Sequence, residues 1–199
     1  MERYLLPLDK IEVEDRYLVG GKAFHLSQLR KAGMPIPAGF CITTVAYRLF
    51  FQEAGIDLEA AVSSLDRGSM QTAPLGKEVM KHPLPRRLYG AIEEAYRGLG
   101  NRPVAVRSSA TREDLPEASF AGQYETYLNV LGLEELVEKV KACWASLWDA
   151  LAYLHRHHIS PLEVVMGVVV QEQIPAEVSG VLFTLNPSTG LEEEMLIEA

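Results

Sequence analysis

The chain has 199 residues, of which 48% are hydrophobic and 23% are charged, a composition typical of a globular protein with one domain or two small ones. Its formal net charge of −8 argues against a nucleic-acid partner, because surfaces that bind nucleic acids are usually basic. No apolar run approaches the roughly 20 residues of a membrane span, so no membrane partner is expected either.

The first predicted element is an amphipathic helix over residues 23–32, where small and apolar side chains recur at helical spacing. The motif GGK at residues 20–22 precedes this helix. A segment with two prolines, residues 34–43, is predicted to be extended. A second helix is predicted to follow it over residues 44–50.

Helices and strands alternate through the rest of the chain, apart from residues 56–84, where no pattern is strong enough for a placement. This alternation indicates an α/β or α+β domain. The predicted helices cover residues 85–99 and 133–153, and the predicted strands lie within residues 104–106, 125–130, 164–175 and 178–187.

The motif GGK is a candidate anion site. Gly20 and Gly21 allow backbone amides to approach an anion closely, and the N-terminal amides of the following helix point the same way. Lys22 adds a positive charge. The spacing is not that of a Walker A motif, and the alternative is a glycine turn beside a solvated lysine.

The segment RSSATREDLPEASFAGQY, residues 107–124, is much longer than the usual connection of about 4–6 residues. Arg107 leaves the end of a strand, where ligand sites collect, and its guanidinium can hold two phosphate oxygens at once. Residues 108–111 add three hydroxyl groups, and Gly122 permits close approach to a phosphate chain. The alternative is a loop that binds no ligand and is held in place by an ion pair between Arg107 and a carboxylate.

Gln171, Glu172, Gln173 and Ile174 end an apolar strand just before a proline. Backbone groups and amide side chains at such a hinge can supply the donor and the acceptor that the edge of a purine requires. The alternative is an ordinary strand end.

His155 and His158 are three positions apart and could ligate a metal. No cysteine or suitably spaced carboxylate joins them, so a solvated helix end is the better interpretation. We assign no metal ligand in this chain.

Three segments together resemble one protein family. They are LVGGKAFHLSQLRKAGMPIPAGFCITTVAYRLF, VAVRSSATREDLPEASFAGQYETYLNV and VVVQEQIPAEVSGVLFTLNP. They are similar to the N-terminal ATP-binding domain of phosphoenolpyruvate synthase, which also occurs in pyruvate phosphate dikinase and rifampicin phosphotransferase. The resemblance covers more than half of the chain, and RSSAT…SFAGQ is its most specific part.

The resemblance implies an α+β fold of the ATP-grasp type, in which two lobes close on ATP. Residues 1–199 would be the N-terminal portion of this domain, without its C-terminal part, and a change of lobe would lie near residues 105–125. The final residues, MLIEA, suggest a strand that stops without a cap, so the natural gene product is expected to continue.

The resemblance also implies which residues bind ATP. Lys22 and Arg107 would be phosphate ligands that stabilise the charge developing during catalysis. The other implied contacts are made by Thr111 on the phosphate side, by Gly122 and Gln123 in a lid over the phosphates, and by Gln171, Glu172, Gln173 and Ile174 at the adenine.

The implied cofactors are ATP and Mg²⁺, and the family's magnesium ligands are expected outside this chain. The family's phosphocarrier histidine lies in a Gly/Thr-rich motif that is absent here, so none of the five histidines takes that role. Two positions depart from the family's usual pattern: Gln173 stands where a methionine is more common, and Asn186 where synthases more often have aspartate.

The predicted function is that of the ATP-binding part of a phosphoenolpyruvate synthase-like phosphotransferase. Such an enzyme phosphorylates a histidine on a separate domain, and that histidine delivers phosphate to pyruvate on a further domain, with AMP and phosphate as products. The alternatives are a rifampicin phosphotransferase, a pyruvate phosphate dikinase, a nucleotide-binding module without catalysis and a structural domain.

Cys41 and Cys143 both lie among apolar residues, so we expect buried free thiols and no disulfide. Residues 1–11 have no sustained apolar core, which argues against a signal peptide. We therefore expect a cytoplasmic protein.

Overall fold

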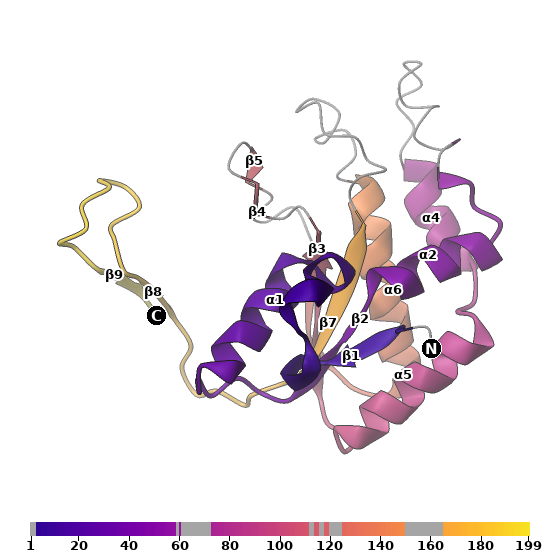
Figure 1. Cartoon of the computed structure of the whole chain (residues 1–199), viewed down its shortest axis with the longest axis horizontal. Coiled ribbons are helices and arrows are strands. Elements are labelled where there is room, and N and C mark those ends of the chain that lie inside the picture. Colours follow the sequence, from indigo (N-terminus) through magenta and orange to yellow (C-terminus); the bar gives the residue numbers. More distant parts are fainter. Residues whose placement is uncertain are drawn as a thin grey trace.

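The computed structural model describes residues 3–58, 60, 73–111, 114–115, 118–119, 125–149 and 165–199. Its centre is a five-stranded sheet in the order β1-β2-β7-β3-β6 (Figure 1). Every neighbouring pair in this sheet is antiparallel. The strands are β1 (Leu5–Pro7), β2 (Gly39–Ile42), β3 (Val104–Ala110), β6 (Thr126–Val130) and β7 (Met166–Glu172).

Helices lie on both faces of this sheet, so the predicted α+β class is confirmed. The helices are α1 (Arg16–Lys31), α2 (Thr44–Glu53), α4 (Ala73–Lys81), α5 (Arg86–Gly98) and α6 (Leu133–Asp149), with short 3-10 turns at Leu8–Lys10 and Val13–Asp15. Two short hairpins complete the described chain: β4 (Asp114–Leu115) with β5 (Ala118–Ser119), and β8 (Val181–Phe183) with β9 (Leu196–Glu198).

The larger core fills the sheet face that carries α2, α5 and α6. Val106 and Val170 are paired across β3 and β7 and point into it. The indole ring of Trp144 lies 5.2 Å from the ring of Phe50 and 5.9 Å from that of Tyr47, measured between centroids. Aromatic rings of this size contribute much of a core's buried apolar area, so this cluster fixes α2 and α6 against each other.

The opposite face of the sheet packs against α1. Val169 alternates with Val170 along β7 and therefore points to this side, where it contacts a smaller core that includes Val19, Ala23 and Cys41. Residues 166–170 of β7 are buried on both faces, which explains why this strand is an unbroken apolar run in the sequence.

Helix α1 is interrupted at Gly20, whose backbone has φ 79° and ψ 171°. The helix predicted over residues 23–32 is therefore the second segment of α1, and the sequence pattern missed the first turn at Arg16–Val19. The helix α4 was also missed, because it lies in the region without a clear pattern. The predicted helix 133–153 is confirmed as far as Asp149, and the remainder lies outside the described residues.

Both cysteines are buried free thiols, as predicted. Burial raises the pKa of the Cys143 thiol to about 12 and raises the pKa of Cys41 as well. A protonated thiol is a poor nucleophile, so neither cysteine is a candidate for covalent chemistry at neutral pH.

The hairpin of β8 and β9 extends away from the body of the fold (Figure 1). Leu182 and Ile197 are paired across its strands and have exposed fractions of 54% and 70%. Among the residues that the structure describes, no helix combines the length and the apolar character needed to cross a bilayer.

Candidate nucleotide-binding site

A pocket of about 300 Å³ opens where β3, β6 and β7 lie side by side. We call it the β3/β7 pocket. It is lined by Pro37, Ala105, Arg107, Thr126, Leu128, Gln171, Glu172, Gln173 and Ile174. The strand pairing explains this grouping, because Arg107 is opposite Thr126 of β6, and Ala105 is opposite Gln171 of β7.

The pocket lies on the α1 side of the sheet. Arg107 is paired with Val169, whose side chain belongs to the core beneath α1, and directly paired residues share a face. Arg107 and the hinge 171–174, which were predicted from distant parts of the sequence, are thus brought into one cavity. That proximity fits a ligand with an anionic part and a planar part.

Hydrogen bonds fix the backbone of the hinge. The Glu172 amide donates to Ala38 O at 2.8 Å, and the Gln173 amide donates to Pro103 O at 2.9 Å. The carboxylate of Glu172 is held by Arg102, 2.6 Å away. Glu172 can therefore contribute to the pocket mainly through its backbone, since its charge already has a partner at the rim.

The amide side chain of Gln171 is buried, and its Nε2 donates to Pro37 O at 3.3 Å. This bond joins the end of β7 to the extended segment before β2. Ile174 differs from Gln171 because 52% of its surface is exposed, so it offers an apolar contact to a ligand in the pocket.

Lys22 reaches β3 from α1, one residue beyond Arg107. Its ammonium donates to the carbonyl oxygen of Ser108 at 2.7 Å, across 86 positions of sequence. Ser108 directly follows Arg107, so the Lys22 ammonium contacts β3 next to the other predicted phosphate ligand. Lys22 is outside the lining of the β3/β7 pocket, which places the cations at one side of the cavity and the hinge at the other.

Thr111 marks the end of the β3–β7 ladder. Its backbone amide donates to Val165 O at 3.0 Å, and its hydroxyl also contacts Val165 O, at 3.3 Å. In this structure the Thr111 hydroxyl therefore stabilises the strand end. Gly122 and Gln123, predicted to cover the phosphates, lie outside the described residues.

Sequence reasoning missed four residues of the pocket: Pro37, Ala105, Thr126 and Leu128. Leu128 is the most informative, because 60% of its surface is exposed although it lies in a strand. In the sequence, only the alternation of side chains along the strand indicates that Leu128 and Tyr127 point to opposite faces of the sheet. That alternation does not show which face is accessible to a ligand.

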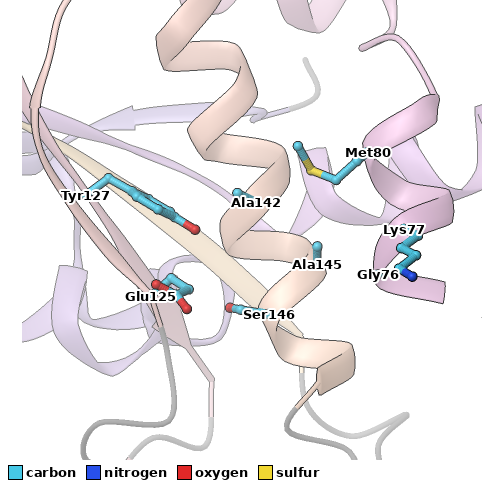
Figure 2. Close-up of a pocket in the computed structure, with 8 residues that line it drawn as sticks. All are labelled: Gly76, Lys77, Met80, Glu125, Tyr127, Ala142, Ala145 and Ser146. Atoms are coloured by element: carbon cyan, nitrogen blue, oxygen red, sulfur yellow. The ribbon is translucent and has the colours of Figure 1, made fainter. Parts of the chain in front are cut away.

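A second pocket, of about 340 Å³, lies on the other side of the sheet. Figure 2 shows it between α4, α6 and β6, lined by Gly76, Lys77, Met80, Glu125, Tyr127, Ala142, Ala145 and Ser146. Burial raises the pKa of the Tyr127 phenol to about 12, and Lys139 Nζ lies 5.1 Å from the centroid of its ring. None of the residues predicted from sequence lines this pocket.

The described part of the chain contains no group of three or more His, Cys, Asp or Glu side chains placed to hold a metal ion. His155, His157 and His158 lie outside that part.

Comparison with known proteins gives a consistent result. The model of the family "Pyruvate phosphate dikinase, AMP/ATP-binding domain" matches residues 16–199. The phosphoenolpyruvate synthase of Aeropyrum pernix is 47% identical over 99% of this chain and 26% of its own length. A probable phosphoenolpyruvate synthase of Staphylothermus marinus is 40% identical over 100% of this chain and 26% of its own length.

A rifampicin phosphotransferase of Streptomyces sviceus is also similar. It is 42% identical over 100% of this chain and 24% of its own length. The chain thus spans about a quarter of the length of the curated relatives that it matches.

Proposed function

Because the chain belongs to the pyruvate phosphate dikinase AMP/ATP-binding domain family, we propose that the β3/β7 pocket binds the adenosine of ATP and that Lys22 and Arg107 bind its phosphates. The observation that carries this proposal is that Arg107 and the hinge 171–174 line a single cavity. Purine sites need apolar walls and a few fixed polar groups, and this pocket has both.

The proposed pose divides the pocket between two kinds of contact. Leu128 and Ile174 are its exposed apolar residues and would contact the faces of the adenine. The backbone carbonyl groups of residues 172–174 and the side-chain amide of Gln173 would meet its edge, because the backbone amides of Glu172 and Gln173 already donate to Ala38 O and Pro103 O. The triphosphate would then extend past Arg107 toward Lys22, with Thr111, Gly122 and Gln123 on the phosphate side.

Residues 1–199 would be the N-terminal portion of an ATP-grasp-type domain, with a change of lobe near residues 105–125, and its second lobe would need further sequence. The exposed apolar residues of the β8–β9 hairpin support this, because an isolated two-stranded hairpin is marginal in water and exposed apolar patches often mark contact surfaces.

For the full-length protein we propose phosphoenolpyruvate synthase chemistry. ATP would phosphorylate a histidine on a separate domain, and the histidine would pass phosphate to pyruvate on another, so that ATP, pyruvate and water become AMP, phosphoenolpyruvate and phosphate. The names and lengths of the relatives support this. Mg²⁺, held by residues outside this chain, would neutralise phosphate charge, while Lys22 and Arg107 would stabilise the transferring group.

Rifampicin phosphotransferase is the second candidate, because one such enzyme is 42% identical to the chain. Both acceptors would bind outside residues 1–199, so this chain serves either reaction equally well. An assay of the full-length protein with pyruvate and with rifampicin in parallel separates them.

Replacing Leu128 with alanine tests the adenine pocket. We expect the KM for ATP of the full-length protein to rise by about fivefold to tenfold, because the loss of a large apolar contact costs about 1 kcal/mol or more. Leu131→Ala is the matched control, since Leu131 is similarly exposed, at 57% against 60% for Leu128, but lies outside the pocket lining. Equal KM values in the two variants would place the adenine elsewhere.

A further inference from the structure

Helix α1 restarts next to the end of β3. After the break at Gly20 the second helical segment begins, and the first amides of such a segment have no partners within their own helix. The Ala23 amide finds one in the side chain of Ser109, donating to its Oγ at 3.0 Å across 86 positions of sequence. Ser109 is fully buried, so water cannot replace its hydroxyl in this role.

The backbones at this point are in close contact. A Cβ atom added to Gly20 would lie 2.1 Å from the carbonyl oxygen of Ser109. Only glycine permits this approach, and it brings the start of the helix directly onto the strand. Lys22 immediately precedes Ala23, and its ammonium donates to the carbonyl oxygen of Ser108. Residues 108 and 109 therefore hold both the backbone and the side chain of the GGK motif.

We infer that Ser109 is a positioning residue for Lys22: by capping the helix at Ala23, its buried hydroxyl sets the distance between the Lys22 ammonium and the Arg107 guanidinium that share one triphosphate. This inference rests on the proposed function. A lysine side chain is flexible, so its ammonium is well placed only if its Cα is fixed. A displacement of about 1 Å at a reacting group can reduce catalysis by up to about 10²-fold.

The test compares Ser109→Ala with Ser27→Ala in the full-length protein. Ser27 is a matched control because it is also fully buried and lies in α1 itself, and its hydroxyl likewise bonds to the backbone, donating to Ile11 O at 3.1 Å. Both variants should lower thermal stability. Only Ser109→Ala should lower kcat for ATP-dependent phosphotransfer, by about tenfold, with the KM for ATP changed less than kcat, because the lost interaction acts on developing charge.

Ser109→Cys keeps the shape of the side chain with a somewhat larger atom in place of the oxygen, and it provides a poor acceptor. It replaces Ser109→Ala if that variant does not fold. Combination with Lys22→Met shows whether Ser109 acts through Lys22. If it does, the double variant should have the kcat of Lys22→Met alone to within about twofold, because residues that act as a unit are not additive. Independent, multiplicative losses would overturn the inference, as would equal kcat values for the Ser109 and Ser27 variants.

The results that would overturn the role of Ser109 can be distinguished from those that would overturn the proposed function. If Lys22→Met alone retains the wild-type rate, then Lys22 is no phosphate ligand, and the inference about Ser109 falls with it. If Lys22→Met is impaired while Ser109→Ala and Ser109→Cys are not, the proposed phosphate site stands and only the positioning role is lost.

Discussion

Replacing Arg107 with alanine is expected to reduce ATP-dependent phosphotransfer by about 10²-fold or more, the usual loss when a donor that stabilises transition-state charge is removed. Arg107 is the cationic residue in the lining of the β3/β7 pocket, and it lies on a strand fixed between two neighbours. The sheet therefore fixes the Cα of Arg107, which limits the positions that its guanidinium can take around the phosphates.

Single-turnover measurements with the full-length protein and ATP give the rate of the phosphotransfer step directly. Arg97→Ala is the control, because it removes an arginine from the exposed surface of α5, where Arg97 pairs with Glu93 at 3.2 Å, and exposed pairs of this kind contribute little. A wild-type rate for Arg107→Ala would remove Arg107 from the site and leave the pocket without its predicted phosphate contact.

The second large effect is expected for Gly20→Ala. The added methyl group would lie 2.1 Å from the Ser109 carbonyl oxygen, and the backbone of Gly20, with φ 79° and ψ 171°, is one that alanine rarely adopts. We expect a loss of at least about 3 kcal/mol in the free energy of unfolding, or separation of α1 from β3 with loss of ATP-dependent activity.

Gly33→Ala provides the comparison. Gly33 also has a positive φ, 85°, but nothing lies within 4 Å of the position its Cβ would take. Gly33→Ala should therefore lower the free energy of unfolding by only about 1–2 kcal/mol, which is the cost of placing alanine in a left-handed backbone conformation. Thermal unfolding of the two variants measures the difference. Equal destabilisation would show that the close approach of α1 to β3 is absent in solution.

The sequence predicted the elements whose patterns are local. The helix at 85–99 and the buried strand from Met166 were recognisable because their apolar residues follow helical spacing or form an unbroken run, and both are confirmed. The helix α4 was not recognised, because it is short and contains Pro74 and Gly76, two residue types that disfavour a helix. Tertiary contact with α6 determines that helix more than its own pattern does.

The candidate site was partly predictable, because some of its residues belong to motifs that are local in the sequence. Lys22 and Arg107 stand out in a sequence because each is a cation beside glycines or hydroxyl residues. The prediction that Arg107 leaves the end of its strand is wrong, because β3 continues through Ser108 and Ser109 to Ala110. Leu128 does not stand out, because apolar residues are common in strands. Only the structure shows that its face of the sheet is exposed and lines the pocket. Ser109 was named only as one of several hydroxyl donors, and its bond to Ala23 depends on the pairing of a strand with a helix far away in sequence.

The residues of the proposed phosphate site meet along one strand. β3 supplies Arg107 to the pocket, Ser108 to the Lys22 ammonium and Ser109 to the start of the helical segment. β7 supplies the hinge next to it. An ATP molecule bound as proposed would therefore contact two adjacent strands and the helix that one of them positions, which explains why these distant segments carry the strongest motifs in the sequence.

The most direct test is to follow the phosphorus species by ³¹P NMR when the full-length protein is incubated with ATP and Mg²⁺, with and without pyruvate. We expect ATP and pyruvate to be converted to AMP, phosphate and phosphoenolpyruvate, with no such conversion when pyruvate is left out, and we expect Arg107→Ala to slow this conversion by about 10²-fold or more. The absence of pyruvate-dependent turnover in the wild-type protein, or an undiminished rate in Arg107→Ala, would contradict this expectation.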